Sequence, residues 1–168
     1  MSEIDFDGDT DTVWDSYLLD RLVDPDGLND GDGRAPSAAG LYLVDEDGEE
    51  VLGAALSIRD ADNYDDATDM FETDVAALFA VAEDDATGAV VNVGGVDYEV
   101  AKRDAVDVGG DGAVPFTYLR AETSGIVLAA LPDMVVAGYY DEDRKNTVEA
   151  TAEAVAACAR ALRVDLSL

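Results

Sequence analysis

The spacing of apolar residues along the chain switches between helical and strand periods. Apolar residues recur every three to four positions in three segments, which predicts helices over about residues 11–23, 65–82 and 144–163. Shorter apolar or alternating runs between these segments predict strands at 41–44, 51–58, 89–93, 96–101, 114–122, 125–131 and 134–140. The predicted order is helix, two strands, helix, about five strands, helix.

Each predicted helix has an apolar face suited to packing against a sheet. In the first helix this face comprises Val13, Trp14, Tyr17, Leu18 and Leu22. In the second helix it comprises Ala67, Met70, Phe71, Val75, Leu78, Phe79 and Ala82. In the third helix the inward positions are Val148, Ala152, Val155, Ala159 and Leu162.

Two pairs of predicted strands are joined by turns that are typical of β-hairpins. Residues 45–48, Asp-Glu-Asp-Gly, join the first pair, and Gly94-Gly95 joins the second. Glycine supplies the positive φ angle that such tight turns need. Hairpin connections imply antiparallel pairing. Strands grouped between helices imply an α+β fold, with a central antiparallel sheet of about six to seven strands.

Length and composition predict one domain. The 168 residues, of which 48% are apolar, suit a single core. We expect an acidic, flexible N-terminus at residues 1–11 and a single domain over residues 12–168. A high content of Gly, Asp and Pro predicts surface loops at residues 24–39 and 104–113.

The charge balance is strongly acidic, with 39 Asp and Glu residues against 10 Lys and Arg residues and a net charge of −29. Like charge on this scale opposes folding in dilute salt, whereas at about 1 M salt the Debye length is only about 3 Å. The acidic, lysine-poor composition is typical of organisms that keep molar salt in the cytoplasm, above all haloarchaea. We therefore expect a cytoplasmic protein that works in high salt. A disordered acidic tail is excluded because aliphatic residues are spread throughout the chain.

The same charge balance narrows the classes of partner. Nucleic acid is disfavoured because phosphate contacts need a basic patch. Membrane insertion is not expected either, since the chain has no apolar run of transmembrane length and does not begin with a signal-peptide pattern. The single cysteine, Cys158, lies in the Ala-rich last helix and is expected to be a small buried side chain, not a reactive thiol.

The residues needed for most enzymatic and metal chemistry are missing from the sequence. The absence of histidine excludes His-based catalysis, and a lone cysteine excludes a cysteine zinc site. The glycine run at residues 109–112 lacks the lysine of a phosphate-binding loop. Acidic clusters at residues 5–9 and 24–27 resemble fragments of calcium loops without their glycine and glutamate. We expect no cofactor, no metal and no enzymatic activity; an acid-only hydrolase or calcium binder is the alternative class.

Positive charge is unevenly distributed along the chain. No basic residue lies between Arg59 and Lys102. Half of the ten basic residues are Lys102, Arg103, Arg120, Arg144 and Lys145. A local basic spot on a polyanion favours an acidic partner. In high salt, screening restricts this attraction to close contacts.

Trp14 and Tyr17 lie one helical turn apart. Two interpretations of this pair are open. The pair belongs either to the core-facing stripe of its helix or to an aromatic platform for a proline-rich ligand.

Three motifs, in the right order, resemble the profilin family. Residues 13–20, VWDSYLLD, resemble the profilin amino-terminal helix with its Trp-x-x-Tyr-like pattern. Residues 93–100, VGGVDYEV, resemble the family's Gly-Gly-x-x-Tyr hairpin. Residues 138–143, GYYDED, resemble its Gly-x-Tyr-Asp-Glu-Pro joint before the last helix, with Asp143 in place of the proline. The similarity covers about residues 12–163 and implies N- and C-terminal helices on one face of the sheet and a middle helix on the other.

The resemblance implies a non-enzymatic protein that binds monomeric actin. The actin-binding face, carried over to this chain, comprises Lys102, Arg103, Tyr118, Arg120, Arg144, Lys145 and Asn146. The basic spot described above falls on this face. Profilins also bind poly-proline between their terminal helices. Trp14 and Tyr17 match one half of that site, whereas the last helix has no aromatic residue to match the other half.

We therefore expect a monomer that binds an actin homologue in a halophilic cell and regulates filament assembly, with a proline-rich protein as a further partner. Phosphoinositide binding is disfavoured by the net charge. The alternative is a roadblock-type regulator of a small Ras-like GTPase. That family has a similar order of elements and works as a dimer.

Overall fold

The computed structural model describes residues 38–44, 47–60, 63–66, 71–83, 87–106, 113–131, 134–142 and 147–166. The predicted first helix, with Trp14 and Tyr17, lies outside the described residues. Arg144, Lys145 and Asn146 also lie outside them. The expectations for these residues are therefore untested by the structure.

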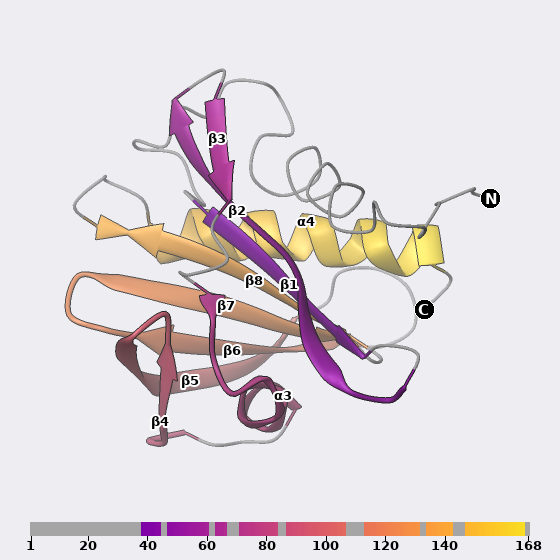
Figure 1. The fold of residues 1–168 in the computed structure, drawn as a ribbon, viewed down its shortest axis with the longest axis horizontal. Coiled ribbons are helices and arrows are strands. Elements are labelled where there is room, and N and C mark those ends of the chain that lie inside the picture. The colour runs from indigo at the N-terminus through magenta and orange to yellow at the C-terminus, as the bar shows by residue number, and fades with distance from the viewer. Residues whose placement is uncertain are drawn as a thin grey trace.

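The described residues form one eight-stranded antiparallel sheet with two helices (Figure 1). The elements are β1 (Ala38–Val44), β2 (Glu50–Asp60), β3 (Asn63–Asp66), α3 (Val75–Glu83), β4 (Val90–Val93), β5 (Val96–Val106), β6 (Val114–Arg120), β7 (Ser124–Leu131), β8 (Met134–Asp141) and α4 (Val148–Leu166). The strand order is β3-β2-β1-β8-β7-β6-β5-β4. Pairings join strands consecutive in sequence, except that β1 pairs with β8. The predicted α+β class is confirmed.

Side chains on β7 alternate between two cores on opposite faces of the sheet. Val127 and Ala129 pack with residues of α4, whereas Ile126 and Leu128 pack with residues of α3. Figure 1 shows α4, in yellow, on one side of the sheet and α3 on the other. We call these two sides the α4 face and the α3 face. Because both faces are covered here, β7 is a nearly unbroken apolar run in the sequence.

Both predicted hairpins are confirmed. Gly48, in the turn between β1 and β2, has φ of 81°, and Gly94 and Gly95, between β4 and β5, have φ of 62° and 83°. Two strands extend into segments that were predicted as loops. β1 begins at Ala38, so the last two residues of the predicted loop at 24–39 are strand, and β5 continues to Val106 into the predicted loop at 104–113. Pairing with the neighbouring strands β8 and β6 accounts for both extensions.

The start of the second predicted helix was wrong. Residues 63–66 form strand β3 beside β2; among the strands that the structure describes, only this one was not predicted from the sequence. Thr73 forms an isolated bridge with Val93, and the Gly94 N–H donates to the Glu72 carbonyl. These long-range bonds engage backbone groups that a helix continuing through residues 72–73 would use internally. Helix α3 therefore begins at Val75, after Asp74, whose Oδ1 accepts a bond from the Ala77 N–H at its N-terminus.

The predicted last helix is confirmed from residue 148 onward. Thr147 is its N-cap: the Thr147 hydroxyl accepts a hydrogen bond of 3.1 Å from the Ala150 N–H. Val155, Ala159 and Leu162 are buried against the sheet, as their spacing predicts. Cys158 is buried with them, in agreement with its predicted place in the core.

Candidate partner-binding face

Lys102 and Tyr118 are cross-strand partners of β5 and β6 on the α4 face. A bulge between Val100 and Lys102 sets this register. The Lys102 ammonium lies 4.7 Å from the centroid of the Tyr118 ring, a cation–π distance. It also lies 3.3 Å from Oδ2 of Asp104. Lys102 is exposed and Tyr118 is half-buried, so this part of the sheet presents an aromatic ring and a cation to solvent.

An open pocket lies between this pair and the first turns of α4. Its volume is about 260 Å³, and it is lined by Lys102, Tyr118, Val148, Glu149 and Ala152. The apolar members of this set are partly buried and pack against the core of the α4 face. Helix α4 packs mainly over β7 and β8. The pocket is therefore the place where the core of the α4 face opens to solvent, beside β5 and β6.

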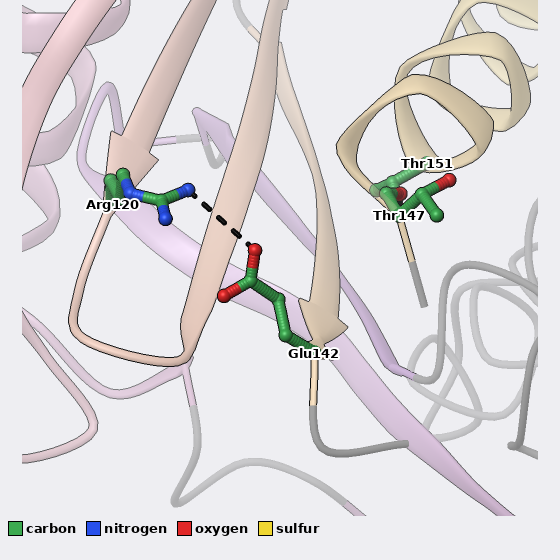
Figure 2. Close-up of polar contacts among 4 residues, drawn as sticks. All are labelled: Arg120, Glu142, Thr147 and Thr151. Atoms are coloured by element: carbon green, nitrogen blue, oxygen red, sulfur yellow. Dashed lines mark hydrogen bonds and ion pairs between the residues drawn. The ribbon is translucent and has the colours of Figure 1, made fainter. Parts of the chain in front are cut away.

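Arg120 extends the same face to the end of β6. Its guanidinium lies 3.8 Å from Oε2 of Glu142, and the two side chains reach toward each other over β7 (Figure 2). Arg120 also lies beside Tyr140: burial raises the pKa of the Tyr140 hydroxyl, and the charge of Arg120 lowers it by a smaller amount. The strand between them contributes Gly125, the register partner of both Arg120 and Tyr140. Because glycine has no side chain, Arg120 can reach across β7 to its two partners.

Backbone bonds hold this end of the sheet in place. The Glu142 N–H donates to the Thr123 carbonyl at 2.9 Å, and the Ala121 N–H donates to the Ser124 carbonyl at 2.8 Å. These bonds fix the turn between β6 and β7 against the end of β8. The N-terminus of α4 lies near the end of β8, where Thr151 hydrogen bonds back to the Thr147 carbonyl (Figure 2). The ends of β6 and β8 and the turn between β6 and β7 therefore border the Arg120–Glu142 pair.

Arg103 lies on the opposite side of the sheet from its neighbour Lys102. Its Nη2 donates a 2.7 Å hydrogen bond to the Glu83 carbonyl at the C-terminus of α3. Thr117 bonds the Val81 carbonyl of the same helix at 3.2 Å. The last carbonyls of a helix lack intrahelical partners, and a cation there also complements the helix dipole. Arg103 thus caps α3 and does not join Lys102 on the α4 face.

The tyrosines on the α4 face stay protonated at neutral pH. Burial raises the pKa of Tyr118, with a further contribution from Asp104, against a lowering by Lys102. Burial likewise raises the pKa of Tyr140, against a lowering by the Arg120 guanidinium. Both hydroxyls are therefore neutral; Tyr140 is buried in the core, whereas Tyr118 is only partly buried and can donate a hydrogen bond to a partner.

Within the described residues no group of three or more His, Cys, Asp or Glu side chains is arranged to hold a metal ion. Among the same residues, no helix is long and apolar enough to span a membrane.

Comparison with solved structures finds chains of similar fold. No protein-family model and no curated protein matches the chain. The solved structure of Acanthamoeba castellanii profilin IA aligns with a TM-score of 0.54 at 14% sequence identity, over 92% of this chain and 99% of that one.

The chain has a profilin-like fold. At this level of identity the likeness establishes the architecture alone, and it agrees with the sheet and the two-sided helix packing described above.

The profilin-like fold brings together three of the residues that the sequence singled out. Lys102, Tyr118 and Arg120 share the α4 face, beside the start of α4. Arg103 is directed to the α3 face.

Sequence reasoning missed the carboxylates Asp104, Glu142 and Glu149, which lie among the basic residues of the α4 face. In a chain with 39 acidic residues, composition gives no signal that distinguishes these three. Alternation places Asp104 on the same face as Lys102 only because β5 continues to Val106, past the predicted end of the strand at residue 101.

Proposed function

We propose that this chain binds the monomer of an actin homologue through the α4 face of β5 and β6. The observation that carries the proposal is the gathering of Lys102, Tyr118 and Arg120 on one exposed face of a profilin-like fold. We further propose that Arg144, Lys145 and Asn146, which precede α4, extend this face. The chain then acts as a binding protein, with no catalytic step of its own.

The proposed contact combines apolar burial with short-range charge pairing. The pocket beside Tyr118 offers apolar surface from Val148 and Ala152 that is continuous with the core. The cations are Lys102, the partner of Tyr118 on β5, and Arg120, two residues beyond Tyr118 on β6. In the molar salt that the composition predicts, charge pairing acts only over direct contact distances. Apolar burial therefore supplies most of the affinity, and the cations supply orientation.

Filament assembly responds to such a protein by mass action. A chain that covers one end of the actin monomer lowers the concentration of monomer free to add to a filament. The effect needs no chemistry and reverses on dissociation. A proline-rich second partner, bound at Trp14 and Tyr17, stays a prediction from the sequence.

Polymerisation of the cognate actin homologue in molar KCl tests the proposal. An excess of the full chain should slow filament assembly, which is measured by light scattering and by pelleting. Charge reversal of Lys102 and Arg120 to Glu should weaken this effect. Arg160→Glu is the matched control because Arg160 is an exposed cation on α4 outside the face. Normal assembly in the presence of excess wild-type chain would contradict the proposal.

A further inference from the structure

Lys102 and Arg120, the exposed cations on the described strands of the α4 face, each lie beside a carboxylate of the same chain. Lys102 Nζ is 3.3 Å from Asp104, with side chains 62% and 46% exposed. Arg120 Nη1 is 3.8 Å from Glu142, with side chains 52% and 45% exposed. Both pairs are open to solvent, and Figure 2 shows the second one at the end of the sheet. Exposed pairs of this kind contribute little to the stability of the fold.

The surroundings of the two pairs are acidic. Glu99 is the register partner of Arg120, and Glu149 lines the pocket beside Lys102. Among the described residues, Lys102 and Arg120 therefore lie beside four carboxylates, those of Asp104, Glu142, Glu99 and Glu149. A carboxylate of the partner that approaches Lys102 or Arg120 must therefore displace Asp104 or Glu142, which already pairs with that cation.

We infer that Asp104 and Glu142 compete with carboxylates of the partner for Lys102 and Arg120, and so hold the affinity of this face below its limit. The inference rests on the proposed function and names the regulation of that same site. Exchange is feasible because the intramolecular pairs are exposed and weak. The partner chemistry that fits is an acidic segment with an apolar side chain beside it, since the cations border an apolar pocket. The competition makes the complex weaker and more readily reversible.

Neutralising either carboxylate should therefore strengthen binding. We expect Asp104→Asn and Glu142→Gln each to lower the Kd for the actin homologue by about two- to fivefold, the range of an exposed ion pair. Glu153→Gln, an exposed carboxylate on α4 outside the face, is the matched control for the change in net charge and should leave the Kd unchanged. Binding is measured in molar KCl with purified actin homologue, and a melting curve of each variant verifies folding.

A double-variant cycle separates competition from general charge. If Asp104 acts by holding Lys102, the gain from Asp104→Asn should vanish in a Lys102→Ala background. A gain that persists there, or equals that of Glu153→Gln, overturns the inference and leaves the proposed function standing. Weaker binding by Asp104→Asn also overturns it, because the carboxylate would then position the lysine. Wild-type chain that fails to bind overturns the proposed function itself.

Discussion

Tyr140 lies over Gly125, its register partner on the adjacent strand. A Cβ atom at residue 125 would collide with the ring and hydroxyl of Tyr140. Because Gly125 has no side chain, Arg120 can also extend across β7 to reach Tyr140 and Glu142. One missing side chain therefore permits both the packing of a core tyrosine and the geometry of the candidate face.

Gly125→Ala should destabilise the fold by about 1–3 kcal/mol, the usual effect of overpacking a core. Chemical unfolding in molar KCl measures the change. The cost should shrink in a Tyr140→Ala background, because the ring that causes the collision is gone. Equal costs in both backgrounds would show that the ring is not the obstacle.

Arg103→Ala should lower stability by about 1–3 kcal/mol, because it leaves the Glu83 carbonyl at the end of α3 without its charged donor. Its exposed neighbour Lys102 offers the matched control, and Lys102→Ala should change the free energy of unfolding by no more than about 0.5 kcal/mol. Binding to the actin homologue should be affected in the opposite way: Lys102→Ala should weaken it more than Arg103→Ala does. A stable Arg103→Ala variant with lost binding would return Arg103 to the partner face.

Tyr42→Phe should destabilise the fold by about 1–3 kcal/mol. Tyr42 is fully buried, and its hydroxyl donates a 2.5 Å bond to the Phe71 carbonyl, which the substitution leaves unsatisfied. Urea unfolding at neutral pH measures this effect. A variant as stable as wild type would indicate that another donor replaces the hydroxyl.

Alkaline pH should destabilise the protein through its buried tyrosines. Burial raises the pKa of Tyr42 and, with partial opposition from a Ser124 hydrogen bond, that of Tyr98. An unfolded tyrosine loses its proton near pH 10. The stabilisation from these groups is therefore complete below about pH 10 and is lost as the pH rises from there through the folded-state pKa values. The free energy of unfolding of Tyr42→Phe, followed across this range, should fall less steeply than that of wild type.

Thr147→Ala should cost about 1 kcal/mol by removing the N-cap of α4. Thr147→Ser keeps the hydroxyl and should stay close to wild type. Thermal unfolding of the pair, in the same buffer, isolates the cap from other effects of the substitution. Similar melting temperatures for Ala and Ser would argue that the hydrogen bond to Ala150 contributes nothing.

The sequence alone determined the local elements and the fold class. Glycines at residues 48, 94 and 95 placed the two hairpins, because few other residues adopt positive φ. The helical spacing of Val155, Ala159 and Leu162 identified the face of α4 that the sheet buries. Turn glycines and helical spacing involve only a few neighbouring residues, so they can be recognised without knowledge of the rest of the chain.

The start of α3 was decided by tertiary structure. Glu72 and Thr73 sit in an apolar helical pattern, yet hydrogen bonds to residues 92–94 hold them out of the helix. No local pattern reports a partner that lies so far along the chain.

For the candidate face, the sequence identified the basic residues, and the tertiary structure decided where they lie. The scarcity of basic residues drew attention to Lys102, Arg103 and Arg120. Which face Lys102 and Arg103 occupy depended on the bulge before Lys102, because a shift of one residue sends a strand side chain to the other face. The pairing of Arg120 with Glu142 required β6, β7 and β8 to lie side by side with a glycine between the two side chains. Sequence supplied the charges, and strand register decided which of them meet.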